Sequence, residues 1–268
     1  LMVSTASRVG TGNIIGVSTA ICLGGFGAIF WMWITAILGG ASAFIESTLA
    51  QIYKHKDPDG TYYGGPSYYM QNALKQRWLG VIFAVILILT YVVGYNMLAS
   101  FNTQDTFKTF SFYDPSKTPI IIGAILAVLF ALCVLGGGKR LTNITGILVP
   151  VMGLIYIVVS LIVVIMNITN LPLVLKNIFV AAFDFKAIFG GFAGSCMMWG
   201  IKRGLYSNEA GMGSAPNAAA SADVSHPVKQ GLVQMLSVFI DTLLVCTATA
   251  MMCMCANPEG LVADAAGA

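Results

Sequence analysis

Charged side chains are scarce in this sequence. Only 9% of its 268 residues are Asp, Glu, Lys or Arg, whereas an average soluble domain has about 25%. Hydrophobic residues make up 57%, and the mean hydropathy is +0.82. The net charge of +3 is too small to imply a polyanionic partner. These values exclude a disordered chain, a nucleic-acid-binding domain and an ordinary cytosolic enzyme, and they indicate a protein embedded in the lipid bilayer.

Histidine is rare, and cysteine has no ligand-like spacing. The two histidines, His55 and His226, fall in polar loops, and the six cysteines lie in apolar segments without a C-x-x-C pair. These facts argue against a haem-ligating span, a zinc site, a disulfide framework and an intramembrane serine–histidine protease. We therefore expect a protein that is not an enzyme and that has no organic cofactor.

Long intervals without charge predict membrane-spanning helices. Four such intervals, which follow Arg8, Arg77, Lys117 and Arg140, have room for the ~20 apolar residues that cross a bilayer. Glycines at 24, 25 and 27 divide the first interval into two spans. The sequence predicts seven helices, at approximately 3–22, 27–51, 78–102, 118–136, 143–166, 178–202 and 230–255.

Basic residues favour one set of the predicted loops. The loops after the second, fourth and sixth helices contain nine of them: Lys54, Lys56, Lys75, Arg77, Lys139, Arg140, Lys202, Arg203 and Lys229. The alternate loops contain four: Lys108, Lys117, Lys176 and Lys186. The positive-inside rule then predicts that the first helix starts in the cytoplasm.

Glycine interrupts the first predicted helix at Gly10, Gly12 and Gly16. Glycine weakens a helix locally, and freed backbone groups in a membrane need protein or a water-filled cavity beside them. The N–H groups that start the second half-helix would suit a carboxylate, and the carbonyls that end the first half would suit Na⁺. Close helix packing through small residues is the alternative interpretation.

A second glycine cluster, residues 190–194 (Gly-Gly-Phe-Ala-Gly), falls in the sixth predicted helix. Two glycine-interrupted spans at corresponding positions of two halves are typical of a transporter binding site. The second interruption comes five helices after the first, which predicts a five-helix repeat. Because five is odd, the two repeats must have opposite orientations in the membrane.

Several polar residues lie within or near the predicted spans. Asp241 is a functional candidate because ionisable groups are costly in a membrane. Arg8 has three options, which are to pair with Asp241, with a substrate carboxylate, or with neither. Asn102 either lines a site or ends a solvated helix. Glu46 is expected either to snorkel or to lie at the cytoplasmic face, and residues 206–216 are expected to form a surface turn with a short helix.

Several motifs resemble the alanine or glycine:cation symporter family, the sodium:alanine symporters. The most specific is GGFGAIFWMWITAILG at 24–39, and the others, in family order, are GTGNI at 10–14, GGP at 64–66, SNEAG at 207–211, GSAP at 213–216, HPVKQGL at 226–232 and FIDT at 239–242. The resemblance implies an all-α polytopic membrane protein of the leucine-transporter type, with two inverted five-helix repeats. Residues 1–170 would be the first repeat and 171–268 the start of the second. The chain opens on Leu1 within apolar sequence, so we expect a piece of a longer protein, truncated after the seventh core helix.

The resemblance also implies a function and a site. The function is Na⁺-coupled symport of a small neutral amino acid, alanine or glycine, by alternating access in a bacterial inner membrane. Proton coupling is an alternative, and a channel or a polytopic membrane enzyme are more distant ones. The implied substrate contacts are Ser7, Thr11, Gly12, Asn102, Phe192 and Gly194. The implied Na⁺ ligands are the carbonyls of Ala6 and Val9, with a second cation site at Asn13 and Asp241 or Thr242.

Overall fold

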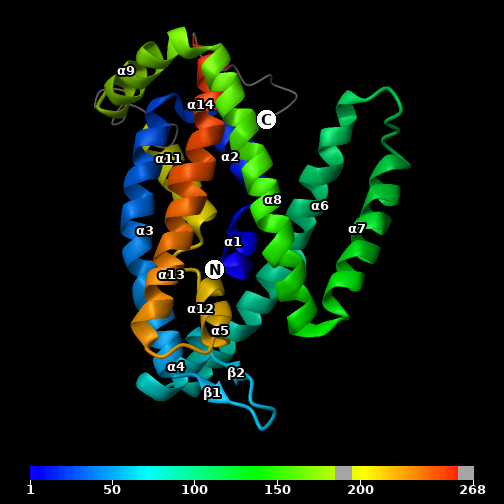
Figure 1. Ribbon diagram of the computed structural model, residues 1–268, viewed down its shortest axis with the longest axis vertical. Coiled ribbons are helices and arrows are strands. Elements are labelled where there is room, and N and C mark those ends of the chain that lie inside the picture. The colour runs from blue at the N-terminus through cyan, green and yellow to red at the C-terminus, as the bar shows by residue number, and fades with distance from the viewer. Residues whose placement is uncertain (185–194, 259–268) are drawn as a thin grey trace.

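Helix α3 (Gly27–Ile52), at the left of the bundle in Figure 1, is the helix on which much of the protein packs. The computed structural model describes residues 1–184 and 195–258, apart from the side chains of residues 138 and 139. The helices that pack most extensively against α3 are α9 (Leu171–Ala182), α11 (Cys196–Asn208), α12 (Ser214–Ala220) and α13 (Pro227–Phe239). Small residues permit the close approach of α11, because a Cβ atom at Gly200 would lie only 2.7 Å from the Cβ of Trp31.

The first predicted span is broken, as the glycines indicated. Helix α1 (Met2–Arg8) ends before Val9, and α2 (Gly12–Gly24) begins after Thr11. Apolar residues of α2, α3, α9 and the last span then form the main buried core, which includes Val17, Ile29, Ile178 and Met254. The packing fixes α2 to the body of the protein, and α1 is a separate seven-residue half-helix.

The middle of the chain forms a hairpin and three long spans. Strand β1 (His55–Lys56) pairs antiparallel with β2 (Tyr62–Tyr63). The elements that follow are α4 (Pro66–Ala73), α5 (Arg77–Leu89), the π-helical segment η1 (Thr90–Tyr95), α6 (Asn96–Asp105), the 3₁₀ turn η2 (Thr106–Thr109), α7 (Thr118–Val134), α8 (Gly137–Met166) and the 3₁₀ turn η3 (Ile168–Asn170). The last span comprises α13, the π-helical segment η5 (Ile240–Cys246) and α14 (Thr247–Ala256).

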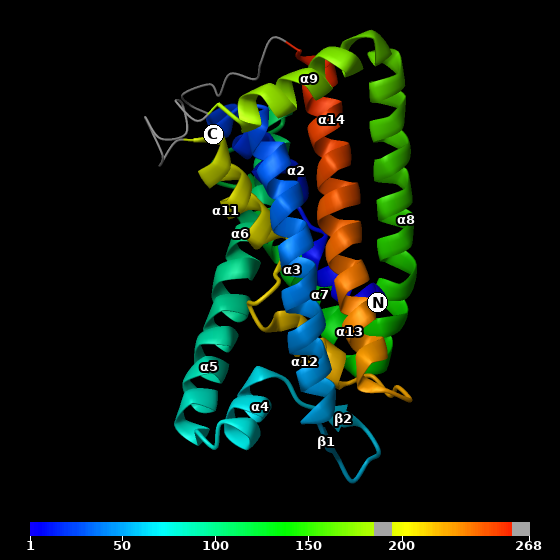
Figure 2. The ribbon, with the colours of Figure 1, turned by 90° about the vertical axis from the view of Figure 1, so that its left-hand side faces the viewer.

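The prediction of one helix over 178–202 is wrong. Helix α9 lies across one end of the bundle (Figure 2) and ends at Ala182, and α11 begins at Cys196. The final carbonyl groups of α9 are bound by side chains from elsewhere. The Trp31 indole donates to the oxygen of Ala182 at 3.1 Å, and the Cys196 thiol donates to that of Ala181 at 3.3 Å. The second glycine cluster, with the predicted contacts Phe192 and Gly194, lies outside the described residues.

The described part of the chain is an all-α polytopic membrane protein, as predicted, apart from the small hairpin. Four of its helical stretches are long and apolar enough to cross a bilayer: Gly27–Ile52, Arg77–Thr109, Arg140–Met166 and Pro227–Ala256. Shorter apolar helices are Gly12–Gly24, Thr118–Val134 and Ile168–Ala182. Large apolar side chains on α5, α7 and α8 are exposed, for example Ile120 at 72% and Ile147 at 72%, as expected where no water meets the surface.

Two of the nine basic residues used for orientation lie in the middle of a helix, and not in a loop or in the first turn of a helix. Lys202 and Arg203 belong to α11, and Arg203 is buried. Without them the bias in the sequence is seven to four, and its direction is unchanged. The hairpin and α4, at the bottom of Figure 1, mark the side on which Lys54, Lys56, Lys75 and Arg77 lie.

Candidate functional site at two helix breaks

A second helix break faces the first one. Helix α11 ends at Asn208 and α12 begins at Ser214, so residues 209–213 interrupt this span. Helix α11 packs on α2, and α1 contacts α12. The first broken span runs toward the α9 end of the bundle and the second runs away from it (Figures 1 and 2). The two interrupted spans therefore cross the bundle in opposite directions.

The second break is buried, so the expectation of a surface turn at 206–216 is wrong. Asn208 is 0% exposed and Glu209 is 2% exposed. Side chains of the protein accept hydrogen bonds from the backbone of this turn. Asn208 Oδ1 accepts from the Ala210 N–H at 3.0 Å, and Glu46 Oε1 accepts from the Gly211 N–H at 3.2 Å. Glu46 is thus a buried partner of the break, and the expectation of a side chain that snorkels to solvent is wrong. The cause is that α12 and α13 cover this part of α3.

A cavity of about 90 Å³ lies between the two breaks. Its walls are the first break with the start of α2, the stretch from η1 to α6, and α11 down to Glu209. Four predicted site residues line it, namely Thr11, Gly12, Asn13 and Asn102. Asn102 is 8% exposed, and its amide Nδ2 donates to Thr11 Oγ1 at 3.3 Å. Of the two options for Asn102, the structure favours the lining residue.

Asp241 lies at 0% exposure in a polar cluster beside this cavity. Its Oδ1 accepts a hydrogen bond from Asn13 Nδ2 at 2.6 Å. Its Oδ2 accepts hydrogen bonds from Ser207 Oγ at 2.7 Å and from Thr242 Oγ1 at 3.0 Å. The structure therefore brings together the predicted residues Asn13, Asp241 and Thr242, and adds Ser207 from the second broken span, which sequence reasoning missed.

The chemistry of this cluster is that of a hard, oxygen-rich donor set. The described residues contain no group of three or more His, Cys, Asp or Glu side chains placed to hold a metal ion. Instead, one carboxylate meets amide and hydroxyl groups, whose oxygen atoms suit hard cations. The end of α1 offers further oxygens. Among the described residues, no backbone N–H donates to the carbonyls of Ala6 or Val9.

Arg203 explains two of the glycines of the first span. Its guanidinium lies across α2, where Nη2 donates to Asn13 Oδ1 at 3.4 Å. A Cβ atom at Gly16 would lie 2.8 Å from Arg203 Cζ, and one at Gly12 would lie 3.3 Å from its Nη1. The sequence predicts Arg203 in a loop, but it lies within α11. The spacing of Gly12 and Gly16, which clears one face of α2, is the signal for a bulky partner there.

Aromatic rings extend from Arg203 along the cavity wall. The guanidinium carbon lies 5.5 Å from the ring centroid of Tyr206. Tyr206 stacks on Tyr95 with centroids 5.7 Å apart, and Tyr95 stacks on Tyr91 at 4.7 Å. The parallel rings join α11 to the π-helical segment η1, and stacked rings of this kind hold their neighbours in register.

Arg8 and Glu209 are buried charged residues that also line the cavity. Arg8 is 4% exposed, and it donates from Nε to the carbonyl of Asn208 at 2.7 Å and from Nη1 to Gln234 Oε1 at 3.2 Å. Its Nη2 has no hydrogen-bond partner among the described residues. Arg8 therefore does not pair with Asp241. Ser7, a predicted substrate contact, donates to Glu209 Oε2 at 3.1 Å.

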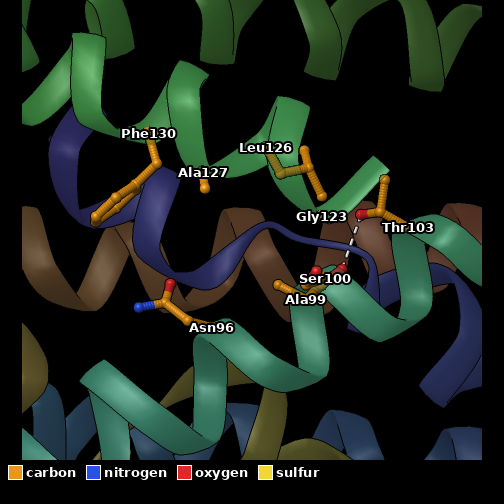
Figure 3. A pocket seen from close by; sticks show the side chains of 8 residues that line it. All are labelled: Asn96, Ala99, Ser100, Thr103, Gly123, Leu126, Ala127 and Phe130. Carbon is orange, nitrogen blue, oxygen red and sulfur yellow. Dashed lines mark hydrogen bonds between the residues drawn. The ribbon is translucent and has the colours of Figure 1, made fainter. Parts of the chain in front are cut away.

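A larger hollow lies between α6 and α7 (Figure 3). Its volume is about 380 Å³, and Ala99, Ser100 and Thr103 face Leu126 and Phe130 across it. The Thr103 hydroxyl donates to the carbonyl of Ala99 at 2.8 Å, so it is already bonded. No charged side chain lines the hollow. An amino acid is a zwitterion, and it would find fewer charged and polar partners here than in the cavity between the breaks.

The fold and the site together define an integral membrane protein with two interrupted spans around a buried polar cluster. The model of the sodium:alanine symporter family matches residues 1–267, and the chain belongs to this family.

Curated relatives carry the names of carriers and symporters. The "Probable sodium/glutamine symporter GlnT" of Bacillus subtilis is 50% identical over 248 residues, which are 92% of this chain and 51% of that protein. The "Amino-acid carrier protein AlsT" of the same species is 48% identical over 92% of this chain and 52% of its own length. The "Sodium/alanine symporter AgcS" of Methanococcus maripaludis is 43% identical over 94% and 55%. The chain spans about half the length of the curated relatives it matches.

Proposed function

We propose that the full-length protein couples the entry of Na⁺ to the uptake of a small neutral amino acid, alanine or glycine, by alternating access. The observation that carries this proposal is the meeting of two oppositely directed broken spans at a buried cluster of oxygen donors. Family membership supports it, and the printed names of relatives include both a sodium/alanine and a sodium/glutamine symporter. Each inward Na⁺ charge would supply ~2.3 kcal/mol per 100 mV of membrane potential.

We propose the leucine-transporter type of fold for the full-length protein, with residues 1–170 as the first five-helix repeat and 171–268 as the start of the second. The second broken span would correspond to the first with inverted orientation. The opposite directions of α1–α2 and α11–α12 support this relation. The proposed location is a bacterial inner membrane.

The substrate carboxylate is proposed to bind at the start of α2, where the N–H groups near Thr11 and Gly12 form the positive end of a half-helix. Asn102 supports this position, because it lines the same cavity and holds the Thr11 hydroxyl. The cavity has room for only a few water molecules, which favours a small side chain. Ser7, Phe192 and Gly194 remain proposed contacts.

Two positions are proposed for Na⁺. The first uses the free carbonyl oxygens of Ala6 and Val9 at the end of α1, together with ligands beyond this chain. The second uses Asn13, Asp241 and Thr242, to which we add Ser207, because its hydroxyl shares the Asp241 carboxylate. These donors come from both broken spans, so occupation by a cation would link the two.

Transport by the full-length protein in proteoliposomes tests the coupling. Uptake of labelled alanine should need an inward Na⁺ gradient, should saturate, and should stop when choline replaces Na⁺. Uptake that is indifferent to choline would remove the Na⁺ proposal. Uptake driven by a pH gradient alone would favour the proton-coupled alternative, and non-saturating currents would favour a channel.

A further inference from the structure

Two neighbouring cavities share a wall made of buried charges. The central cavity lies between the helix breaks, and a second cavity of about 410 Å³ lies among α1, α5, η1 and α12. Arg8 and Glu209 are the two residues that line both cavities. One wall of the second cavity is α12, which contacts β2 and therefore lies toward the hairpin side, the side that the basic residues mark as cytoplasmic. The wall thus stands between the central cavity and the cytoplasmic side.

One oxygen atom of Glu209 joins three separate elements at this wall. Glu209 Oε2 accepts hydrogen bonds from Ser7 in α1 at 3.1 Å, from Tyr91 in η1 at 3.1 Å and from Ser214 in α12 at 2.7 Å. All three donors line the second cavity. Hydrogen bonds to a carboxylate are stronger than those between neutral groups, and Glu209 is 2% exposed.

A second residue of α1, Arg8, also reaches this break, at the carbonyl of Asn208, and the polar contacts of Ser4 and Thr5 lead elsewhere. Ser4 accepts from Gln234 at 2.6 Å, and Thr5 shares a hydrogen bond of 3.3 Å with Ser237, so these residues attach α1 to α13. Among the described residues, Glu209 is the link between α1 and η1. The backbone of Glu209 is left-handed, with φ of +50°, a conformation that a non-glycine residue keeps only where its surroundings fix it.

We propose that Glu209 is a positioning residue that holds α1 against η1 and α12, and so keeps the central cavity closed toward the cytoplasm. Release of substrate to the cytoplasm then requires that the hydrogen bonds to Glu209 Oε2 separate. This inference rests on the proposed transport function, because it assigns Glu209 a role in alternating access.

The test measures access to a cysteine placed in the central cavity of the full-length protein. Gly10→Cys is suited to this, because Gly10 lines the cavity and a Cβ atom there meets no other atom within 4 Å. Native cysteines are replaced, and a membrane-impermeant maleimide is applied to inside-out and right-side-out vesicles. The comparison is between Tyr91→Phe, which removes one donor to Glu209, and Tyr95→Phe. Tyr95 belongs to the same ring stack, but its hydroxyl reaches Met212 Sδ at 3.7 Å.

Tyr91→Phe should raise the rate of cytoplasmic labelling about tenfold, the ratio equivalent to ~1.4 kcal/mol. Tyr95→Phe, which keeps all three donors to Glu209, should raise it much less. Ser214→Ala, which removes a second donor, should act in the same direction. Equal rates in the two tyrosine variants would overturn the proposal. A rise from both faces of the membrane would overturn it too, because a general loosening of the structure has no preferred side.

The failure of the proposed function can be recognised separately. Na⁺ and alanine together should slow the labelling of Gly10→Cys in the parent protein if this cavity is the transport site. The absence of protection would contradict the proposed function, whereas the difference between the tyrosine variants reports on Glu209 alone.

Discussion

The two helix breaks that meet in this protein are built from different chemistry. The first, Val9–Thr11, is short, and its neighbours Asn13 and Asn102 are neutral. The second, residues 209–213, is longer and contains the buried acid Glu209 in a left-handed conformation. The first break presents backbone groups to the cavity, because small residues leave them uncovered. At the second break, side chains of the protein already accept hydrogen bonds from the backbone N–H groups of the turn.

This difference separates binding from positioning. Free backbone groups at the first break are available to a ligand, whereas the carboxylates of Glu46 and Glu209 are already hydrogen-bonded within the protein. We therefore expect substitutions at the first break to change affinity. Substitutions at the second should change the balance between conformations.

The largest effect is expected at Asp241, which connects the two spans by binding Asn13 and Ser207. In Asp241→Asn the charge that favours a cation is lost, and three donors lose a carboxylate acceptor. Because hydrogen bonds to charged groups contribute ~1.5–3 kcal/mol each, the apparent affinity for Na⁺ should fall by roughly a hundredfold. Alanine uptake as a function of Na⁺ concentration measures this change.

A matched control for Asp241 is Asp105→Asn. Asp105 pairs with Lys108 at the end of α6, where both side chains are partly exposed, and exposed ion pairs contribute little. Its Na⁺ dependence should equal that of the parent. If the two variants show the same dependence of uptake on Na⁺ concentration, Asp241 does not contribute to Na⁺ binding.

The second prediction concerns Gly16, on the α2 side of the first break. Gly16→Ala places a methyl group against the buried guanidinium of Arg203, and overpacking of this kind costs ~1–3 kcal/mol. The thermal midpoint of the purified full-length protein should fall clearly. Gly10→Ala is the control, because its methyl group enters open space. If both variants have the thermal midpoint of the parent protein, the packing of Arg203 on α2 does not require glycine at position 16.

The sequence predicts the first break and misses the second for a physical reason. Glycine within an apolar run has few explanations, so Gly10 and Gly12 indicate an interruption. Residues 207–211 are small and polar, and such residues are usually exposed in loops. Their burial depends on Glu46 and Asn208 supplying internal hydrogen bonds, and these contacts exist only after α3 and α11 have packed.

The individual site residues show the same limit. Asp241 stands out because an acid in an apolar run is costly, and Thr242 and Asn13 follow from nearby motifs. Ser207 and Arg203 do not stand out, because serine and arginine are ordinary at a predicted loop. The end of α9 also could not be predicted from the sequence, because it depends on hydrogen bonds from Trp31 and Cys196 to the last carbonyl groups of the helix.

The third prediction tests the neutral chemistry of the first break. Thr11→Val removes the hydroxyl that Asn102 contacts, so the KM for alanine should rise about tenfold, as expected for the loss of one or two hydrogen bonds. Thr19→Val is the control, because the Thr19 hydroxyl donates only to the carbonyl of Ile15 in its own helix. An unchanged KM in Thr11→Val would remove this residue from the substrate site.

The smallest effect is expected at Glu46, and it compares the two acids of the second break. Glu46 accepts one backbone N–H, from Gly211, and the amide oxygen of Gln can accept the same bond. Glu46→Gln should therefore change the uptake rate by only about twofold, which is equivalent to ~0.4 kcal/mol, because the hydrogen bond itself is kept. Glu209→Gln should cost more, because three hydroxyl groups donate to a single carboxylate oxygen. Uptake rates of the two variants, measured side by side, show which substitution costs more. A larger loss of uptake in Glu46→Gln would mean that the charge on α3, and not the hydroxyl cluster around Glu209, controls the second break.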